Sequence, residues 1–169
     1  MLFFLFLIIA LSECGVTRHY SSKLLLVSLD GFRWDYLSRD LALDNFHDFS
    51  RAGVKAKWMT NQFQTKTFPN HWTMVTGLYE EAHGVVANAF YDHQGHYFNY
   101  VNASSWNDRP EFWGGEPLWI TNQRQGGHSG CEFWVGSEVH GREPTYFDAY
   151  DSHKENGRLL RSSSDVVGR

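Results

Sequence analysis

The sequence has no dense run of lysine or arginine, and its 169 residues carry a formal net charge of −4. A protein that binds a nucleic-acid polymer normally presents a basic patch or stripe to the phosphate backbone. We therefore expect no nucleic-acid polymer among the partners of this chain, whereas a nucleotide stays open as a small substrate. The length suffices for one domain, and an aromatic content of 17% supplies large side chains for its core.

A long apolar run is also missing, because the apolar stretch at residues 2–11 is too short to cross a bilayer. A transmembrane helix needs about 20 apolar residues to span roughly 30 Å of hydrocarbon. Small residues follow at Ser12 and Cys14, where a signal peptidase could cut, so residues 1–14 are predicted to be a secretory signal peptide. An unusual membrane anchor is the alternative, since the only positive charge ahead of the stretch is the amino terminus.

Cysteine is scarce, with two in the chain, Cys14 and Cys131. Cleavage after Cys14 would leave Cys131 alone in an oxidising compartment. This thiol is then expected to be either buried and free or paired with a cysteine outside the chain. The tripeptide Asn102-Ala103-Ser104 matches the N-glycosylation pattern. Together with the predicted signal peptide, it indicates a protein of the secretory pathway, at the cell surface or outside the cell.

Residues 23–29 form a continuous Leu/Val-rich run of strand length that ends at Asp30-Gly31. A strand that is apolar on both faces belongs to the middle of a parallel sheet covered by helices, so the sequence predicts an α/β fold. Ligands of such sheets bind beyond the carboxyl ends of the strands, which is where Asp30 falls. Asp30 is therefore a candidate ligand for a cation, although a core strand that simply enters a turn would show the same pattern.

The segment Thr65–Trp72 contains a Phe68-Pro69 corner, and a helix is predicted over 70–76, ended by Gly77. This places Thr67 at or near a helix N-terminus, where exposed N–H groups favour a phosphate. A threonine hydroxyl is a poor nucleophile at neutral pH, so it needs a neighbouring base or a bound cation. Thr67 is the candidate nucleophile, and an extended corner before an ordinary helix is the alternative.

The other elements are predicted from apolar spacing and from glycine or proline stops. Residues 92–115 have no clear period and are expected to be a loop or insert. The polar segment 152–169 is expected to be a disordered tail. The remaining predictions are helices over 41–52 and 117–125 and strands over 54–59, 85–91 and 131–135.

Five segments follow one another in a characteristic order: Lys23–Arg33, Thr65–His71, Gly84–Asn88, Gly115–Thr121 and Tyr146–Tyr150. In this order they resemble the ecto-nucleotide pyrophosphatase/phosphodiesterase family, within the alkaline phosphatase superfamily. The resemblance covers residues 22–151, which are expected to be part of a phosphodiesterase catalytic domain, whereas the polar tail 152–169 is expected to be off the family pattern. It implies the N-terminal part of an alkaline-phosphatase-like mixed, mostly parallel sheet flanked by helices.

The resemblance also implies roles for individual residues. Family members hold two zinc ions side by side, with Asp30 and Thr67 matching ligands of one ion and Thr67 matching the nucleophile that forms a phosphothreonine. Asn88 matches an asparagine that donates to a phosphate oxygen, for which a plain turn is the alternative. Phe68 and Tyr150 match aromatics that sandwich the base of a nucleotide. Ordinary core packing is the alternative for Tyr150.

Several other conspicuous residues receive more ordinary interpretations. His83 is predicted to be a turn histidine bonded to backbone, and Asp92-His93 is predicted to be a turn. Asn70 and His71 are explained by a polar cap at a helix start. Trp119 is a further candidate for the base pocket.

The remaining aspartate and histidine ligands of the family come from a second half of the domain that these 169 residues do not contain. Zinc needs about four ligands per ion, so Asp30 and Thr67 cannot complete the site. We therefore expect a fragment or truncated product that is inactive by itself, while the longer protein hydrolyses nucleotide pyrophosphate or phosphodiester bonds. The alternatives are a choline or lipid phosphodiesterase of the same family, a non-catalytic secreted binding fragment, or a chain that misfolds and has no function. Any membrane anchor would lie in downstream sequence.

Overall fold

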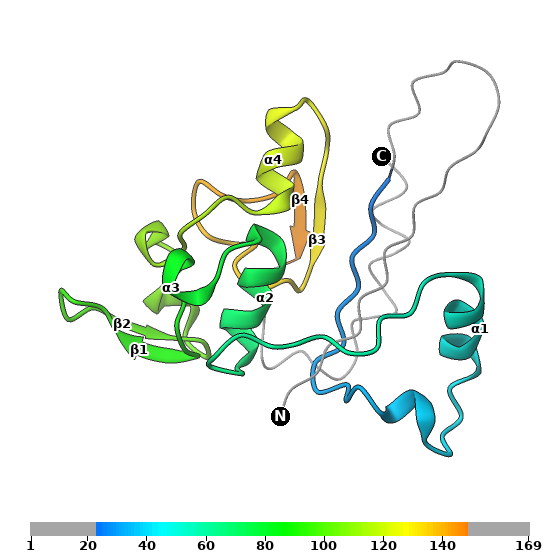
Figure 1. The fold of residues 1–169 in the computed structure, drawn as a ribbon. Helices are drawn as coiled ribbons and strands as arrows, with labels where there is room; N and C mark the ends of the chain where they lie inside the picture. Colours follow the sequence, from blue (N-terminus) through cyan, green and yellow to red (C-terminus); the bar gives the residue numbers. More distant parts are fainter. Residues whose placement is uncertain (1–22, 149–169) are drawn as a thin grey trace. The chain divides into compact units, whose positions relative to one another are not determined.

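The computed structural model describes residues 23–148, a mixed α/β chain of short helices and strands (Figure 1). It divides into two compact units, one ending at Asn61 and one beginning at Gln62, and each is described by itself. The predicted signal peptide 1–14, Tyr150 and the predicted tail 152–169 lie outside the described residues. Between residues 23 and 148, no helix has the length and apolar character needed to cross a membrane.

The first unit contains the 3-10 helix η1 (Tyr36–Ser38) and helix α1 (Asp44–Ala52). Helix α1 starts later than the predicted range of 41–52 but ends where predicted, at Gly53. The Phe46 ring of α1 stacks on Phe32, with ring centroids 5.2 Å apart. This contact ties α1 to the turn that follows Asp30.

Two of the predicted strands are wrong for the described structure. Within 23–29 only Leu26 forms an isolated bridge, and 54–59 carries no strand. Leu24 and Leu25 are each 57% exposed, and Val54 is 99% exposed. A strand is held by backbone hydrogen bonds to a neighbouring strand, so an apolar run becomes a strand only where such a partner lies beside it. The described residues of this unit supply no ladder for either run.

The second unit contains helices and two small sheets. Strands β1 (Ala89–Tyr91) and β2 (Tyr97–Asn99) pair antiparallel, whereas β3 (Gly130–Glu132) and β4 (Tyr146–Asp148) pair parallel. The other elements are α2 (Thr67–Thr76), α3 (Glu80–His83), η2 (Ala103–Ser105), η3 (Pro110–Phe112) and α4 (Leu118–Arg124). Helix α2 lies in the middle, with the β1–β2 hairpin on one side and α4 with the β3–β4 pair on the other (Figure 1).

Local signals predicted the helices of this unit better than its sheets. The helix predicted over 117–125 is α4, and the strands predicted over 85–91 and 131–135 shrink to β1 and β3. The expected mostly parallel sheet is represented, among the described residues, by one parallel and one antiparallel pair. The loop expected over 92–115 contains β2, a strand of only 3 residues, which is too short to show a period in sequence.

An aromatic cluster fills the core of the second unit. Phe68, Trp72, Phe98, Trp106 and Trp113 are all fully buried. Trp72 and Trp113 meet edge to face with centroids 4.9 Å apart, and Trp106 meets Trp113 at 5.2 Å. Burial of each large apolar side chain contributes roughly 1.5–3 kcal/mol, and an edge-to-face pair adds about 0.5–1.5 kcal/mol. The cluster joins α2 to β2 and to the segment that follows it.

Cys131 lies on β3 as a free, partly buried thiol. Burial raises the pKa of this thiol to about 12. Cys14 lies outside the described residues, and a partner cysteine beyond the chain, the other expectation, stays a prediction.

Replacement of Gly136 by alanine should destabilise the second unit strongly. Gly136 has a φ of +80°, and a Cβ there would lie 2.7 Å from Trp113 Cζ3 and 2.8 Å from Trp72 Cζ3. Gly141 has a similar φ of +78° but open space at its Cβ position, so Gly141→Ala tests the backbone strain alone. In urea unfolding we expect a loss of about 1 kcal/mol for Gly141→Ala and roughly 3 kcal/mol or more for Gly136→Ala. Equal losses would contradict the described packing of the two tryptophans.

Candidate active site

Helix α2 begins at Thr67, one turn earlier than the predicted 70–76. Lys66 precedes it with extended backbone (φ −114°, ψ 162°), and Gly77 ends it in the left-handed conformation (φ 69°). Pro69 is accommodated because the first-turn N–H groups have no partner inside the helix. Thr67 is the first residue of a 10-residue helix, so the prediction of its place is confirmed. It lies where N–H groups and the helix dipole favour an anion.

Asn88 reaches the first turn of α2 from the segment that leads into β1. The Phe68 N–H donates to Asn88 Oδ1 at 2.9 Å, and the Asn88 carbonyl accepts from the Tyr100 N–H at 2.8 Å. The first bond satisfies one of the open N–H groups of the helix, and the second ties Asn88 to the end of the hairpin. Two of the predicted site residues, Thr67 and Asn88, therefore lie together.

Asn70 holds the segment that leads into the candidate nucleophile. It is 3% exposed, and its Oδ1 accepts from the Gln62 N–H at 2.8 Å. Its Nδ2 donates to the carbonyls of Gln64 (3.1 Å) and Lys66 (3.0 Å). Three bonds from one buried amide fix this segment against α2. The predicted cap role missed this, since the only signal was a carboxamide directly after a proline.

His71 is turned toward the backbone of the candidate nucleophile. Its Nδ1 lies 2.7 Å from the Thr67 carbonyl oxygen, and its ring meets Trp134 edge to face at 5.2 Å. Because a carbonyl oxygen only accepts, Nδ1 carries the proton and is not placed to take one from the Thr67 hydroxyl. His71 supports the first turn of α2, in agreement with its predicted structural role.

The Phe68 ring lies in the core. It is 0% exposed and meets Phe98, Tyr100 and Trp106 edge to face at 5.9, 5.7 and 5.9 Å. This differs from the stacking role that the resemblance implies for Phe68, because an enclosed ring offers no face to a nucleobase. Tyr150, the second aromatic implied in base binding, lies outside the described residues.

Trp119, the further candidate for the base pocket, is also a core residue, since it is 5% exposed. Its Nε1 donates to the Arg142 carbonyl at 2.7 Å, and its ring meets Trp72 edge to face at 5.7 Å. In the described structure Trp119 therefore fixes α4 to α2.

His83 closes α3 and is buried, with 1% of its surface exposed. Its Nδ1 accepts from the Val85 N–H at 3.1 Å, and its Nε2 lies 2.9 Å from Thr73 Oγ1. Nδ1 is therefore unprotonated, and Nε2 carries the ring proton. Burial lowers the pKa of His83 to about 4, so the ring is neutral at physiological pH. The prediction of a histidine bonded to backbone is confirmed.

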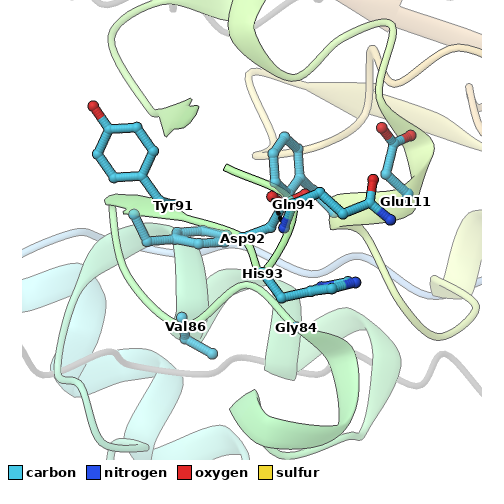
Figure 2. Close-up of a pocket in the computed structure, with 9 residues that line it drawn as sticks. Gly84, Val86, Tyr91, Asp92, His93, Gln94 and Glu111 are labelled. Atoms are coloured by element: carbon cyan, nitrogen blue, oxygen red, sulfur yellow. Dashed lines mark hydrogen bonds between the residues drawn. The ribbon is translucent and has the colours of Figure 1, made fainter. Parts of the chain in front are cut away.

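A cavity of about 340 Å³ lies beside the β1–β2 hairpin, and His93, Gln94 and Glu111 are among its lining residues (Figure 2). Asp92 stabilises the hairpin turn, because its Oδ1 accepts from the N–H groups of Gln94 (2.9 Å) and His96 (2.8 Å). The predicted turn at Asp92-His93 is confirmed. The candidate nucleophile does not line this cavity, which is distinct from the N-terminus of α2.

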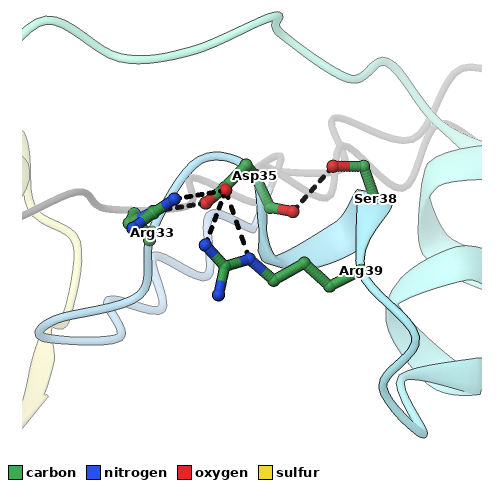
Figure 3. A network of polar contacts seen from close by, with 4 residues as sticks. All are labelled: Arg33, Asp35, Ser38 and Arg39. Carbon is green, nitrogen blue, oxygen red and sulfur yellow. Dashed lines mark hydrogen bonds and ion pairs between the residues drawn. The ribbon is translucent and has the colours of Figure 1, made fainter.

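Asp30 belongs to the first unit, where it is exposed in the turn before Gly31 (φ 72°). A network of ion pairs follows this turn (Figure 3). The Arg33 guanidinium pairs with the Asp35 carboxylate at 2.5 Å, and Arg39 pairs with the same carboxylate at 2.9 Å. Arg33, assisted by Arg39, holds the pKa of the Asp35 carboxyl well below its usual range. Exposed pairs contribute little to stability, so the network mainly orders the chain after Asp30.

A complete set of zinc ligands is not assembled by the described residues. Between residues 23 and 148, no three His, Cys, Asp or Glu side chains are grouped so that they could hold a metal ion. Zinc takes about four ligands. Asp30 and Thr67, the ligands implied by the resemblance, supply two oxygens. The described donor set therefore does not by itself fit the two-zinc site.

Asn102 is exposed at the start of η2, and Ser104 Oγ donates to Asn102 Oδ1 at 2.7 Å. The residues around it are also exposed or only partly buried. A glycan could be attached to this amide without displacing a core side chain.

Comparisons with known proteins show which family the chain resembles. The family model described as Type I phosphodiesterase / nucleotide pyrophosphatase matches residues 24–165. The chain is 44% identical over 139 residues to the Xenopus laevis protein named bis(5'-adenosyl)-triphosphatase enpp4, covering 80% of this chain and 29% of that protein. It is 41% identical over 154 residues to Homo sapiens ectonucleotide pyrophosphatase/phosphodiesterase family member 5, covering 88% of this chain and 31% of that protein.

Solved structures agree with the sequence matches. Murine ectonucleotide pyrophosphatase/phosphodiesterase 5 has a TM-score of 0.65 and 42% identity, covering 71% of this chain and 32% of that chain. A second structure of the murine protein, 41% identical, is described as an inactive threonine-to-alanine variant in complex with AMP. The α/β fold class predicted from the sequence is confirmed by this likeness.

The fold and the matches define the family to which the chain belongs, that of the type I phosphodiesterases and nucleotide pyrophosphatases. The chain belongs to the type I phosphodiesterase/nucleotide pyrophosphatase family, as the resemblance predicted. The matched range continues to residue 165, beyond the predicted region of 22–151. The chain spans about three tenths of the length of these two curated relatives, 29% of the first and 31% of the second.

Folding stability should depend on pH through His83. Because burial lowers the folded pKa of His83 from 6.5 to about 4, its stabilising effect is complete above pH 6.5 and is lost as the pH falls toward 4. We expect the advantage of the wild type over His83→Gln in free energy of unfolding to fall by about 2–3 kcal/mol across that interval. Urea unfolding at a series of pH values measures it. The exposed His93 gives a control variant, His93→Gln, and the same pH slope in both comparisons would count against the assignment.

Proposed function

We propose that this chain supplies the nucleophile and part of the phosphate site of an enzyme that hydrolyses nucleotide pyrophosphate or phosphodiester bonds through a phosphothreonine at Thr67. The observation that carries the proposal is the 2.9 Å hydrogen bond from the Phe68 N–H to Asn88 Oδ1. This bond sets the Asn88 carboxamide against the first turn of α2, beside Thr67. Membership of the phosphodiesterase family supports the same class of reaction.

In the proposed reaction, Thr67 Oγ forms a bond to phosphorus while the bond from phosphorus to the leaving oxygen breaks. The leaving group takes up the proton of the Thr67 hydroxyl and departs as an alcohol or a phosphate, and Thr67 keeps the phosphoryl group, with its nucleoside, as an ester. Water then adds to phosphorus, the bond to Thr67 Oγ breaks, and a nucleoside monophosphate is released. A threonine hydroxyl needs a base or a cation to react at neutral pH. We propose two zinc ions in the complete protein, with Asp30 and Thr67 among their ligands and the others from outside the described residues.

The start of α2 is suited to a phosphate. With its oxygen bonded to the Phe68 N–H, the Asn88 carboxamide has Nδ2 as its donor for a phosphate oxygen. The N-terminus of this 10-residue helix adds partial positive charge. A donor placed where negative charge develops in a transition state is worth about 2.7–4 kcal/mol. Asn88 would thus act mainly on the rate of phosphoryl transfer.

A nucleotide is the substrate class that the relatives support. One relative is named bis(5'-adenosyl)-triphosphatase, and the murine relative was solved with AMP. The inactivity of a threonine variant of that relative is consistent with a threonine nucleophile. We propose that Tyr150 contacts the base, whereas the burial of Phe68 favours a packing role for that ring. A choline or lipid phosphodiester is the alternative substrate, since Thr67 and Asn88 would serve it equally.

Activity should require more of the family domain than these 169 residues. We expect the purified chain, with zinc added, to leave a nitrophenyl nucleotide ester intact, and a longer form that includes the downstream domain to hydrolyse it. In that longer form Thr67→Ala should abolish turnover, and Asn88→Ala should lower kcat about 10²–10³-fold. Thr60→Ala, at an exposed threonine of the first unit, should leave turnover unchanged.

Two results would overturn this proposal: zinc-dependent turnover by the 169-residue chain, or turnover that survives Thr67→Ala. The choice of substrate is tested with the same longer form. Faster hydrolysis of diadenosine polyphosphate than of glycerophosphocholine supports a nucleotide, and the reverse order supports the choline or lipid alternative.

We also propose that the chain enters the secretory pathway and carries an N-glycan at Asn102. When the chain is expressed in mammalian cells, peptide N-glycosidase F should increase the gel mobility of the secreted product. Asn102→Gln and Ser104→Ala should remove the shift, whereas Ser104→Thr, which keeps the hydroxyl, should retain it. Secreted wild-type chain whose mobility is unchanged by the glycosidase would show that Asn102 is not modified.

A further inference from the structure

Glu80 is a buried carboxyl that the proposed chemistry does not use. It is the first residue of α3 and only 3% exposed, and its Oε1 is buried without a hydrogen-bond partner. The Gln64 N–H faces the same carboxyl group. An unsatisfied buried polar group costs about 1–3 kcal/mol, and more when it is charged. A carboxyl in this position therefore calls for an explanation beyond packing.

Gln64 lies in the segment that leads into Thr67. Its carbonyl accepts from Asn70 Nδ2 at 3.1 Å and from the Lys66 N–H at 2.8 Å. Asn70, on α2, thus donates to the carbonyl of Gln64, while Glu80, on α3, faces the N–H of Gln64. The two buried side chains hold both polar groups of one residue, three positions before the start of α2.

We propose that Glu80 is a positioning residue for Thr67 that acts through the Gln64 N–H, and that gain or loss of its proton changes how firmly residues 62–66 are held. The role of Thr67 as the nucleophile rests on the proposed function. The carboxylate form accepts from the Gln64 N–H more strongly, because charge-assisted hydrogen bonds are about twice as strong as neutral ones. The neutral form avoids burying a charge.

Glu80 changes between its neutral and carboxylate forms near neutral pH. Burial raises the pKa of Glu80 to about 7, the Gln64 N–H works against this shift, and the charge of Glu81 adds to it. Three other titratable groups lie on α3, on residues 62–66 and on α2. The one on α3 is His83, which is neutral because its own pKa is about 4. The others are Lys66, at the end of the segment, and His71 on α2, whose Nδ1 faces the Thr67 carbonyl.

The sign of the effect on stability follows from the raised pKa. The stability contributed by Glu80 is complete below its ordinary value of 4.5 and is lost as the pH rises through about 7. Ionisation of Glu80 therefore strengthens its hydrogen bond to the Gln64 N–H, while it lowers the free energy of unfolding of the surrounding fold.

Titration of the isotope-labelled 169-residue chain by NMR tests this inference without any substrate. The Glu80 carboxyl carbon, the Gln64 amide proton and the Thr67 amide proton should all titrate with one midpoint near 7. The Gln64 proton should move downfield on ionisation as its hydrogen bond strengthens. Glu80→Gln should remove the transition from both amides. Glu81→Gln, at the exposed neighbour, should keep it, with a slightly lower midpoint because a negative charge is gone.

A Glu80 carboxyl that titrates near its ordinary value of 4.5 would overturn the inference. So would amides of Gln64 and Thr67 that do not follow Glu80, or that keep their transition in Glu80→Gln. The wild-type titration decides the point even if a variant fails to fold. These outcomes are independent of hydrolysis: a Thr67 that proves not to be the nucleophile would still show the transition, and an active Thr67 would not create it.

Discussion

The burial of Phe68 is the constraint on which the arrangement at the start of α2 depends. The ring is 0% exposed and enclosed by Phe98, Tyr100 and Trp106. The first residues of a helix usually fray, because their N–H groups lack partners inside the helix. Here the second residue is anchored, its N–H is aimed at Asn88 Oδ1, and Thr67 is kept half-buried at the edge of the core.

The buried position of Phe68 depends in turn on packing throughout the second unit. Trp72, on the same helix, donates through Nε1 to the Gly114 carbonyl at 2.8 Å. The Arg142 guanidinium donates to the carbonyls of Trp113 and Gly115, which connects the segment before β4 with the same region. The geometry of the first turn therefore depends on residues far along the chain. A change in this distant packing is expected to move Thr67 without touching it.

The sequence predicted what local chemistry decides and missed what distant partners decide. The proline corner and Gly77 located α2, and His83 before a glycine was correctly interpreted as a structural histidine. The runs at 23–29 and 54–59 had the composition of strands but no neighbouring strand in the described structure.

The candidate site shows the same limit. Thr67 and Asn88 could be named from the ordered motifs, and the structure brings them together. Asn70 and Glu80 act on backbone N–H and carbonyl groups, which leave no pattern in residue spacing. The enclosure of Phe68 comes from aromatic residues of later segments, so its burial could not be foreseen from the motif that contains it.

The free thiol on β3 has a kinetic consequence. Only the thiolate attacks a disulfide or an alkylating reagent, and raising the pKa of Cys131 from 9.0 to about 12 lowers the thiolate population roughly a thousandfold at neutral pH. The same cysteine in an unfolded chain has the ordinary pKa and reacts at the ordinary rate. The rate at which Cys131 is alkylated therefore reports the fraction of chains in which this thiol has become exposed to solvent.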